Sequence, residues 1–151
     1  MPASDAELIA RTASARGITV ATAESLTGGA LAQPLAAAPD AATWFAGGVV
    51  AYTLATKTRV LGVPEGPVVT APTARRMAEG VRELTGADVA VAVTGVGGPG
   101  EEEGQPAGTV FLAIVTSDST RVTEFAFEGD PASVVEQTVA STLHALRVDL
   151  G

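Results

Sequence analysis

The chain has 151 residues, the size of one domain, with nine basic and seventeen acidic residues and a net charge of −8. This acidic balance argues against a nucleic-acid partner, because affinity for phosphates comes largely from Lys and Arg. The absence of cysteine excludes disulfides and thiolate metal sites, and no apolar run is long enough to cross a membrane. The first residues show no secretory signal, so we expect one cytoplasmic domain over residues 1–151.

Predicted helices and strands alternate along the chain. The first half is expected to hold a helix that Ser4 caps and that ends near Arg16, a strand over 18–23, a helix over 30–38, a strand over 44–52 and a short helix over 56–61. The second half is expected to hold a helix over 72–85, a strand over 87–93, a hairpin of strands over 109–116 and 121–127, and a helix over 131–148. This order predicts an α/β protein, a single three-layer α/β/α domain with a mixed β-sheet.

Two local features refine this prediction. Gly47-Gly48, inside the expected strand 44–52, indicate a bulge or a close backbone approach. The last helix is expected to bury an apolar stripe formed by Val135, Val139, Leu143 and Leu146.

The first candidate site is the segment Ala23-Glu24-Ser25-Leu26-Thr27-Gly28-Gly29, between a predicted strand and a predicted helix. Unpaired N–H groups at such a junction can hold an oxyanion, and the two glycines let a substrate approach the backbone. Ser25 is then a candidate nucleophile. The alternative, which this segment alone favours, is that Ser25 or Thr27 is only a helix N-cap.

Lys57 and Tyr52 form the second candidate. Eight of the nine basic residues are arginine, Lys57 is the only lysine, and Tyr52, five positions earlier, is the only tyrosine. A serine nucleophile needs a base, and a lysine whose pKa is lowered by burial can serve, whereas arginine stays protonated. The alternative, with equal weight, is a surface lysine on a short helix.

The third candidate is the glycine-rich loop from Thr94 to Gly100, which contains a G-x-G-x-x-G pattern after a predicted strand. No helix is predicted after it, so the dinucleotide-binding interpretation fails. A loop lining a small-molecule pocket and a flexible turn both remain open. Glu101 to Glu103 are expected at a solvated tip and His144 on a helix surface, and no metal site is predicted.

Together these segments resemble the C-terminal domain of the competence/damage-inducible protein CinA, a family also found alone as nicotinamide-nucleotide amidase. The similarity runs from about residue 5 to residue 148 and rests on the order and spacing of several stretches. These are residues 22–29, 44–52 with Lys57, 61–63, 77–80, 92–100, 106–110 and 129–130.

The resemblance implies hydrolysis of the carboxamide of nicotinamide mononucleotide (NMN) to nicotinate mononucleotide and ammonia. It implies a serine nucleophile, a lysine base and a nearby tyrosine, which map onto Ser25, Lys57 and Tyr52. The substrate-binding residues expected in the flanking turns are Glu24, Thr27, Gly28, Gly29, Thr94, Gly95, Gly97 and Gly98. No metal or organic cofactor is expected. The expected partner is the small nucleotide substrate, without nucleic acid or membrane, and a homo-oligomer, with a dimer favoured.

A second hypothesis is a catalytically silent nucleotide- or partner-binding module, linked to competence or DNA damage as the family's name suggests. The chain departs from the family's pattern at three places: Thr53-Leu54, Gly97 and Pro131 stand where Ser-Asn, Ala and Arg are common. The intact Ser25, Tyr52 and Lys57 favour the enzyme, and the altered turns favour the module.

Overall fold

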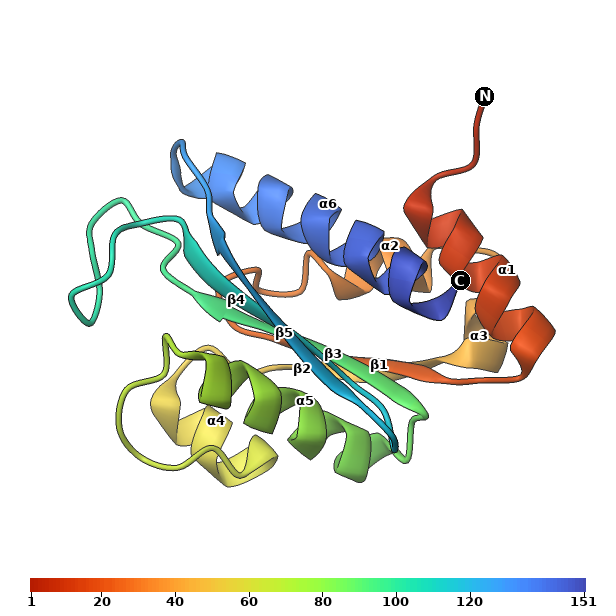
Figure 1. Cartoon of the computed structure of the whole chain (residues 1–151), viewed down its shortest axis with the longest axis horizontal. Coiled ribbons are helices and arrows are strands. Elements are labelled where there is room, and N and C mark those ends of the chain that lie inside the picture. Colours follow the sequence, from red (N-terminus) through yellow and green to blue (C-terminus); the bar gives the residue numbers. More distant parts are fainter.

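The computed structural model describes residues 1–151 as helices alternating with the strands of one sheet (Figure 1). In chain order the elements are α1 (Asp5–Arg16), β1 (Val20–Glu24), α2 (Ala32–Ala36), α3 (Ala41–Trp44), β2 (Phe45–Val50), α4 (Leu54–Leu61), α5 (Ala71–Thr85), β3 (Val89–Gly95), β4 (Thr109–Val115), β5 (Thr120–Ala126) and α6 (Pro131–Leu150).

The sheet has five strands in the order β2-β1-β3-β4-β5. Strand β1 runs parallel to both β2 and β3, whereas β4 and β5 pair antiparallel, so the predicted mixed sheet is confirmed. Helices α4 and α5 cover one face of the sheet, and α1, α2 and α6 cover the other (Figure 1). The predicted three-layer α/β/α architecture is therefore confirmed as well.

The two faces of the sheet bury side chains of different size. On β3, Val89, Val91 and Val93 join the cluster beneath α1 and α6, whereas Ala90 and Ala92 face α5. Alternation along a strand sends successive side chains to opposite faces, and small side chains let a helix lie close to the sheet. No helix is both long enough and apolar enough to span a membrane.

The glycine pair in β2 lies at an irregularity in the sheet, as predicted. The pairing of β1 with β2 skips one residue, because Val20 lies opposite Phe45 and Ala21 lies opposite Gly47. Gly47 has φ 119°, a backbone conformation that favours glycine, and a Cβ on Gly48 would collide with the Oγ1 and backbone oxygen of Thr22. Glycine is therefore needed at position 47 for the backbone conformation and at position 48 for the close approach of β1.

Two details differ from the prediction. The strand expected over 44–52 begins one residue later, because Trp44 ends α3, where it is buried and its indole N–H donates to Pro39 O at 2.9 Å. In α6 the fully buried positions are Val134, Thr138, Thr142, Leu146 and Leu150, and the other three residues of the expected stripe are only half-buried.

Two threonines can occupy the buried face of α6 because backbone carbonyl oxygens of the same helix accept hydrogen bonds from their hydroxyls. Thr138 Oγ1 donates to Val134 O at 2.7 Å, and Thr142 Oγ1 donates to Thr138 O at 2.6 Å. A hydroxyl that is hydrogen-bonded in this way can be buried without leaving an unpaired polar atom. The hydrophobic pattern alone therefore placed the stripe about one residue too far along the helix.

Candidate active site

A cavity of about 140 Å³ lies where the three parallel strands end. In an open α/β sheet, ligands bind in the crevice outside the carboxyl ends of the strands, at the point where the connections leave in opposite directions. The cavity is lined by Ser25 and Leu26 after β1, Tyr52 and Lys57 after β2, Thr94, Gly95, Gly97 and Gly98 at and after β3, and Val68, Val69 and Glu102. The three residues proposed for chemistry therefore meet in one place.

Ser25 directly follows β1, and its side chain is free for chemistry. The residue is 7% exposed, and its hydroxyl makes no hydrogen bond within the protein. Residues 25–31 form successive turns, and α2 begins only at Ala32, with Leu31 at the N-cap and no side-chain cap. The N-cap interpretation of Ser25 and Thr27 is therefore wrong, and the helix predicted over 30–38 is shorter at both ends.

The turn that carries Ser25 is organised by Glu24, the last residue of β1. The Glu24 side chain is 1% exposed, and its Oε1 accepts from Thr27 Oγ1 at 2.5 Å, from the Gly29 N–H at 3.2 Å and from the Leu31 N–H at 2.9 Å. Its Oε2 accepts from the Ala32 N–H at 3.0 Å. Four donors thus compensate one buried carboxylate and fold the chain around it.

This arrangement divides the expected substrate-binding residues into two groups. Thr94, Gly95, Gly97 and Gly98 line the cavity. Glu24, Thr27, Gly28 and Gly29 do not; the Glu24 carboxylate accepts bonds from Thr27 and Gly29 behind the Ser25 turn.

Lys57 lies in α4 and is 2% exposed, so the surface-lysine interpretation is wrong. Its Nζ donates to the carbonyl oxygen of Tyr52 at 3.0 Å, and no carboxylate lies within ion-pair distance. Burial lowers the pKa of Lys57 from its ordinary value of 10.5, and the negative charges of Glu102 and Glu103 partly oppose that effect. A buried amine with a lowered pKa is a good candidate for a general base.

Tyr52 contributes two separate groups to the site. Its backbone carbonyl accepts a hydrogen bond from the Lys57 amine, and the residue, which is 67% exposed, also lines the cavity. The orientation of Lys57 therefore depends on the course of the backbone at Tyr52 and not on the phenol.

The glycine-rich loop follows β3 and continues to β4 without a helix. The context required for a dinucleotide fingerprint is thus absent, as predicted. Gly95 is required by packing, because a Cβ there would lie 2.4 Å from the backbone oxygen of Thr109. No group of three or more histidine, aspartate or glutamate side chains is placed to hold a metal ion.

Sequence reasoning missed four residues around the cavity: Val68, Val69, Glu102 and Glu103. Glu101, Glu102 and Glu103 are exposed, as expected of a solvated tip, but the Glu103 carboxylate also accepts hydrogen bonds from the N–H groups of Val68 and Val69. The partners are 34 and 35 positions apart, and no spacing rule connects them. His144, by contrast, lies on the surface of α6 as expected, with its side chain 61% exposed.

The three departures from the family's pattern keep the local structure intact. Thr53 is the N-cap of α4, with Oγ1 accepting from the Thr56 N–H at 3.3 Å, a bond that serine also makes. A Cβ on Gly97 would meet only Leu26 Cβ, at 3.9 Å, so alanine fits there too. Pro131 follows the N-cap Asp130 of α6, where the fixed φ of proline is tolerated.

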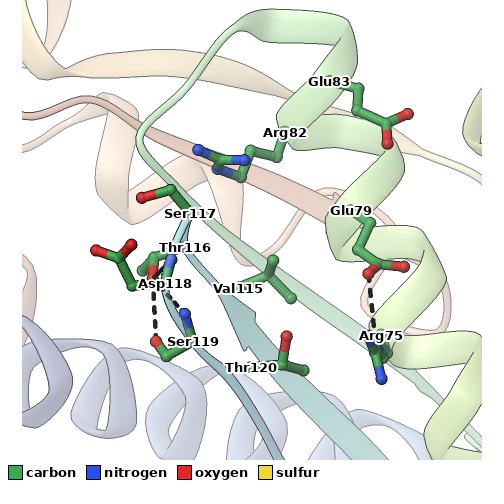
Figure 2. Close-up of a pocket in the computed structure, with 10 residues that line it drawn as sticks. All are labelled: Arg75, Glu79, Arg82, Glu83, Val115, Thr116, Ser117, Asp118, Ser119 and Thr120. Atoms are coloured by element: carbon green, nitrogen blue, oxygen red, sulfur yellow. Dashed lines mark hydrogen bonds and ion pairs between the residues drawn. The ribbon is translucent and has the colours of Figure 1, made fainter.

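A larger hollow of about 370 Å³ lies between α5 and the turn that joins β4 to β5 (Figure 2). Its two arginines already have partners: Arg75 pairs with Glu79 at 3.2 Å, and Arg82 Nε donates to Asp88 O at 3.2 Å. At the turn, the Thr116 and Ser119 hydroxyls lie 3.0 Å apart (Figure 2). This hollow contains no lysine, and none of its serine or threonine residues is buried, so the smaller cavity is the candidate site.

Fold and cavity define a class of protein: a mixed α/β domain with a free serine hydroxyl and a buried lysine at the carboxyl ends of its parallel strands. A family model described as the CinA C-terminal domain matches residues 3–150, and the chain belongs to this family. A CinA-like protein of Citrifermentans bemidjiense is 43% identical over 137 residues, covering 87% of this chain and 33% of that protein. The chain spans about a third of the length of the curated relatives it matches.

Solved structures agree with the family assignment over the whole chain. The competence damage-inducible protein A (ComA) of Klebsiella pneumoniae is 38% identical with a TM-score of 0.92, covering 98% of each chain. A competence or damage-inducible protein of Enterobacter asburiae is 32% identical with a TM-score of 0.93, covering 99% of this chain and all of the other.

Proposed function

We propose that this domain is a serine amidohydrolase that converts NMN to nicotinate mononucleotide and ammonia. The observation that carries the proposal is that the free hydroxyl of Ser25 and the buried amine of Lys57 line one cavity. The resemblance described above supplies the identity of the amide, and no residue of the lining argues for a metal-dependent alternative.

In the proposed reaction, neutral Lys57 accepts the proton of Ser25 while Oγ attacks the carboxamide carbon. The tetrahedral intermediate collapses as the lysine ammonium returns the proton to the amide nitrogen, and ammonia leaves. Water then attacks the acyl-serine with Lys57 again as the base. The second collapse releases nicotinate mononucleotide, and Ser25 recovers its proton.

The backbone amide of Leu26, beside the nucleophile, is a candidate donor for the oxyanion hole. Leu26 lines the cavity, and its N–H donates to no acceptor within the protein, whereas Gly28 N–H donates to Ser25 O at 3.1 Å. An unused donor directly after a nucleophile suits a developing negative charge. It supplies this stabilisation without any side chain.

The lining of the cavity suits the positively charged pyridinium ring of NMN. Tyr52 and Glu102 both line the cavity and are exposed, and an aromatic face and a carboxylate each attract a cation. Free nicotinamide has a neutral ring and lacks this attraction, so we expect it to be hydrolysed more slowly than NMN and nicotinamide riboside.

The test is ammonia release from NMN, nicotinamide riboside and nicotinamide, with and without a chelator. We expect turnover of NMN that the chelator leaves unchanged and that Ser25→Ala abolishes, because the variant lacks the proposed nucleophile. Circular dichroism of the variant checks that the fold is kept. Substantial turnover by folded Ser25→Ala, or loss of activity with the chelator that a divalent ion restores, would overturn the mechanism.

The second candidate function is a silent nucleotide- or partner-binding module. It is favoured by the lining, which contains no arginine to hold a phosphate, and by relatives whose names refer to competence and damage. Calorimetric binding of NMN by the wild-type chain without any ammonia release would support the module and contradict the enzyme.

A further inference from the structure

We propose that Glu103 is a positioning residue of the active site: its carboxylate fastens the Val68-Val69 wall of the cavity to the glycine-rich loop. This inference rests on the proposed amidase function for its catalytic consequence, but not for its structural one. Residues 64–70, between α4 and α5, contain no helix or strand, so no regular backbone hydrogen bonds hold this wall in place.

The contacts account for every backbone polar group of the two valines. Glu103 Oε1 accepts from the Val68 N–H at 3.1 Å and the Val69 N–H at 2.9 Å, and Oε2 accepts from the Val68 N–H at 2.9 Å. Thr94 Oγ1 donates to Val68 O at 3.0 Å, and Gln105 Nε2 donates to Val69 O at 2.6 Å. Both amides of the wall therefore depend on one carboxylate, and both carbonyls depend on residues at the end of β3 and in the loop after it.

The backbone of Glu103 adopts a left-handed conformation that glutamate rarely takes. Glu102 and Gln105 exchange backbone hydrogen bonds of 3.1 Å and 2.8 Å around a two-residue turn. Both central residues have positive φ, 54° at Glu103 and 74° at Gly104, as in a type I′ turn. Asn, Asp or Gly is usual at the first of these positions, and a glutamate there is costly unless its side chain is needed.

The same carboxylate also acts on the base electrostatically. Glu103 and Glu102 are the two charges that oppose the effect of burial on the pKa of Lys57, and Tyr52 is the other titratable group in the lining. Removing the charge of Glu103 should therefore lower the pKa of Lys57 further, a change that loss of packing alone would not produce.

The experiment compares Glu103→Ala and Glu103→Gln with the matched control Glu101→Ala, an exposed neighbour without side-chain hydrogen bonds. Hydrogen exchange measured by NMR reports on the Val68 and Val69 amides, and we expect both to exchange about 10- to 100-fold faster in Glu103→Ala, as expected on losing hydrogen bonds to a charged acceptor. Glu103→Gln keeps one acceptor oxygen and should show a smaller increase. Glu101→Ala should match the wild type.

Kinetics with NMN tests the catalytic consequence. We expect kcat/KM to fall about tenfold or more in Glu103→Ala, mainly through KM, since the wall helps to hold the substrate. In Glu103→Gln the limb along which the rate rises with pH should move to lower pH. Unchanged exchange of both amides in folded Glu103→Ala, or equal effects in Glu101→Ala, would overturn the proposal. If the wild type releases no ammonia, the amidase function fails while the exchange result still decides the role of Glu103.

Discussion

Lys57 is a single residue in which the requirements of folding and of chemistry conflict. Its amine lies in a nearly closed environment with one carbonyl acceptor, and burial disfavours the charged form. A purely structural role would be better served by an apolar side chain. The neutral amine that burial favours is the form that the proposed mechanism uses.

We predict that Lys57→Arg lowers kcat by about 10² to 10⁴-fold, the range for loss of a general base. The guanidinium stays protonated and cannot take the proton of Ser25. Because the pKa of Lys57 is lowered, the wild-type rate should rise with pH along a limb centred below 10.5, and this limb should be absent in the variant. Near wild-type turnover by Lys57→Arg with the same limb would contradict the assignment.

Lys57→Met provides the matched control for stability. Between the lowered pKa of Lys57 in the folded chain and its ordinary value of 10.5, the unfolded chain binds more protons than the folded one. The destabilisation caused by burying the charged amine is therefore fully present below the lowered pKa and disappears as the pH rises to 10.5. We expect the variant to be inactive but more stable to urea than the wild type at neutral pH, with the advantage shrinking toward pH 10.5. Equal stability at neutral pH would show that the amine is not buried as a charge.

At the scale of elements, the site depends on irregular segments that regular ones hold in place. The turn after β1 contains no helix, yet Glu24 binds the Thr27 hydroxyl and three backbone amides within it. The hydrogen bonds to this one carboxylate take the place of the regular backbone hydrogen bonds of a strand or helix. The position of Ser25 therefore depends on Glu24, a residue that does not line the cavity.

We predict that Glu24→Gln destabilises the fold by about 1 to 3 kcal/mol, because the amide nitrogen cannot accept and leaves buried donors unpaired. The turnover of NMN should fall as well, since the turn carrying Ser25 loses part of its support. Urea unfolding and the ammonia assay measure the two effects. Glu7→Gln, on the exposed first turn of α1, is the control and should change neither. Wild-type stability in Glu24→Gln would contradict the role of the carboxylate.

Elements differ in how much of their structure the sequence could predict. The nearly all-apolar strand β3 and the capped helix α5 could be predicted because burial on both faces and capping residues leave local patterns. The buried face of α6 could not, since Thr138 and Thr142 are polar by type and satisfied only within the helix. For the site, Ser25 and Lys57 stood out by chemistry, whereas the Val68-Val69 wall depends on contacts with residues 26 to 36 positions away.

At the scale of the whole molecule, sheet order brings the site together. Because β1 lies between β2 and β3, the residues after all three strands converge at one end of the sheet (Figure 1). Ser25, Lys57 and Thr94 are far apart in the chain and meet only after β1 has paired on both sides. The antiparallel strands β4 and β5 contribute no lining residue.

A cavity assembled from three distant segments has a thermodynamic consequence: its occupant binds the folded chain and not the unfolded one. A ligand at a hundred times its Kd should therefore add about 2.7 kcal/mol to the free energy of unfolding, and for a domain of this size that raises Tm by about 5 to 10 °C. Thermal melts of the non-hydrolysing Ser25→Ala variant with NMN, nicotinamide riboside and nicotinamide would rank these amides as ligands without any turnover. An unchanged Tm with all three, at concentrations that saturate the wild-type reaction, would contradict their binding in this cavity.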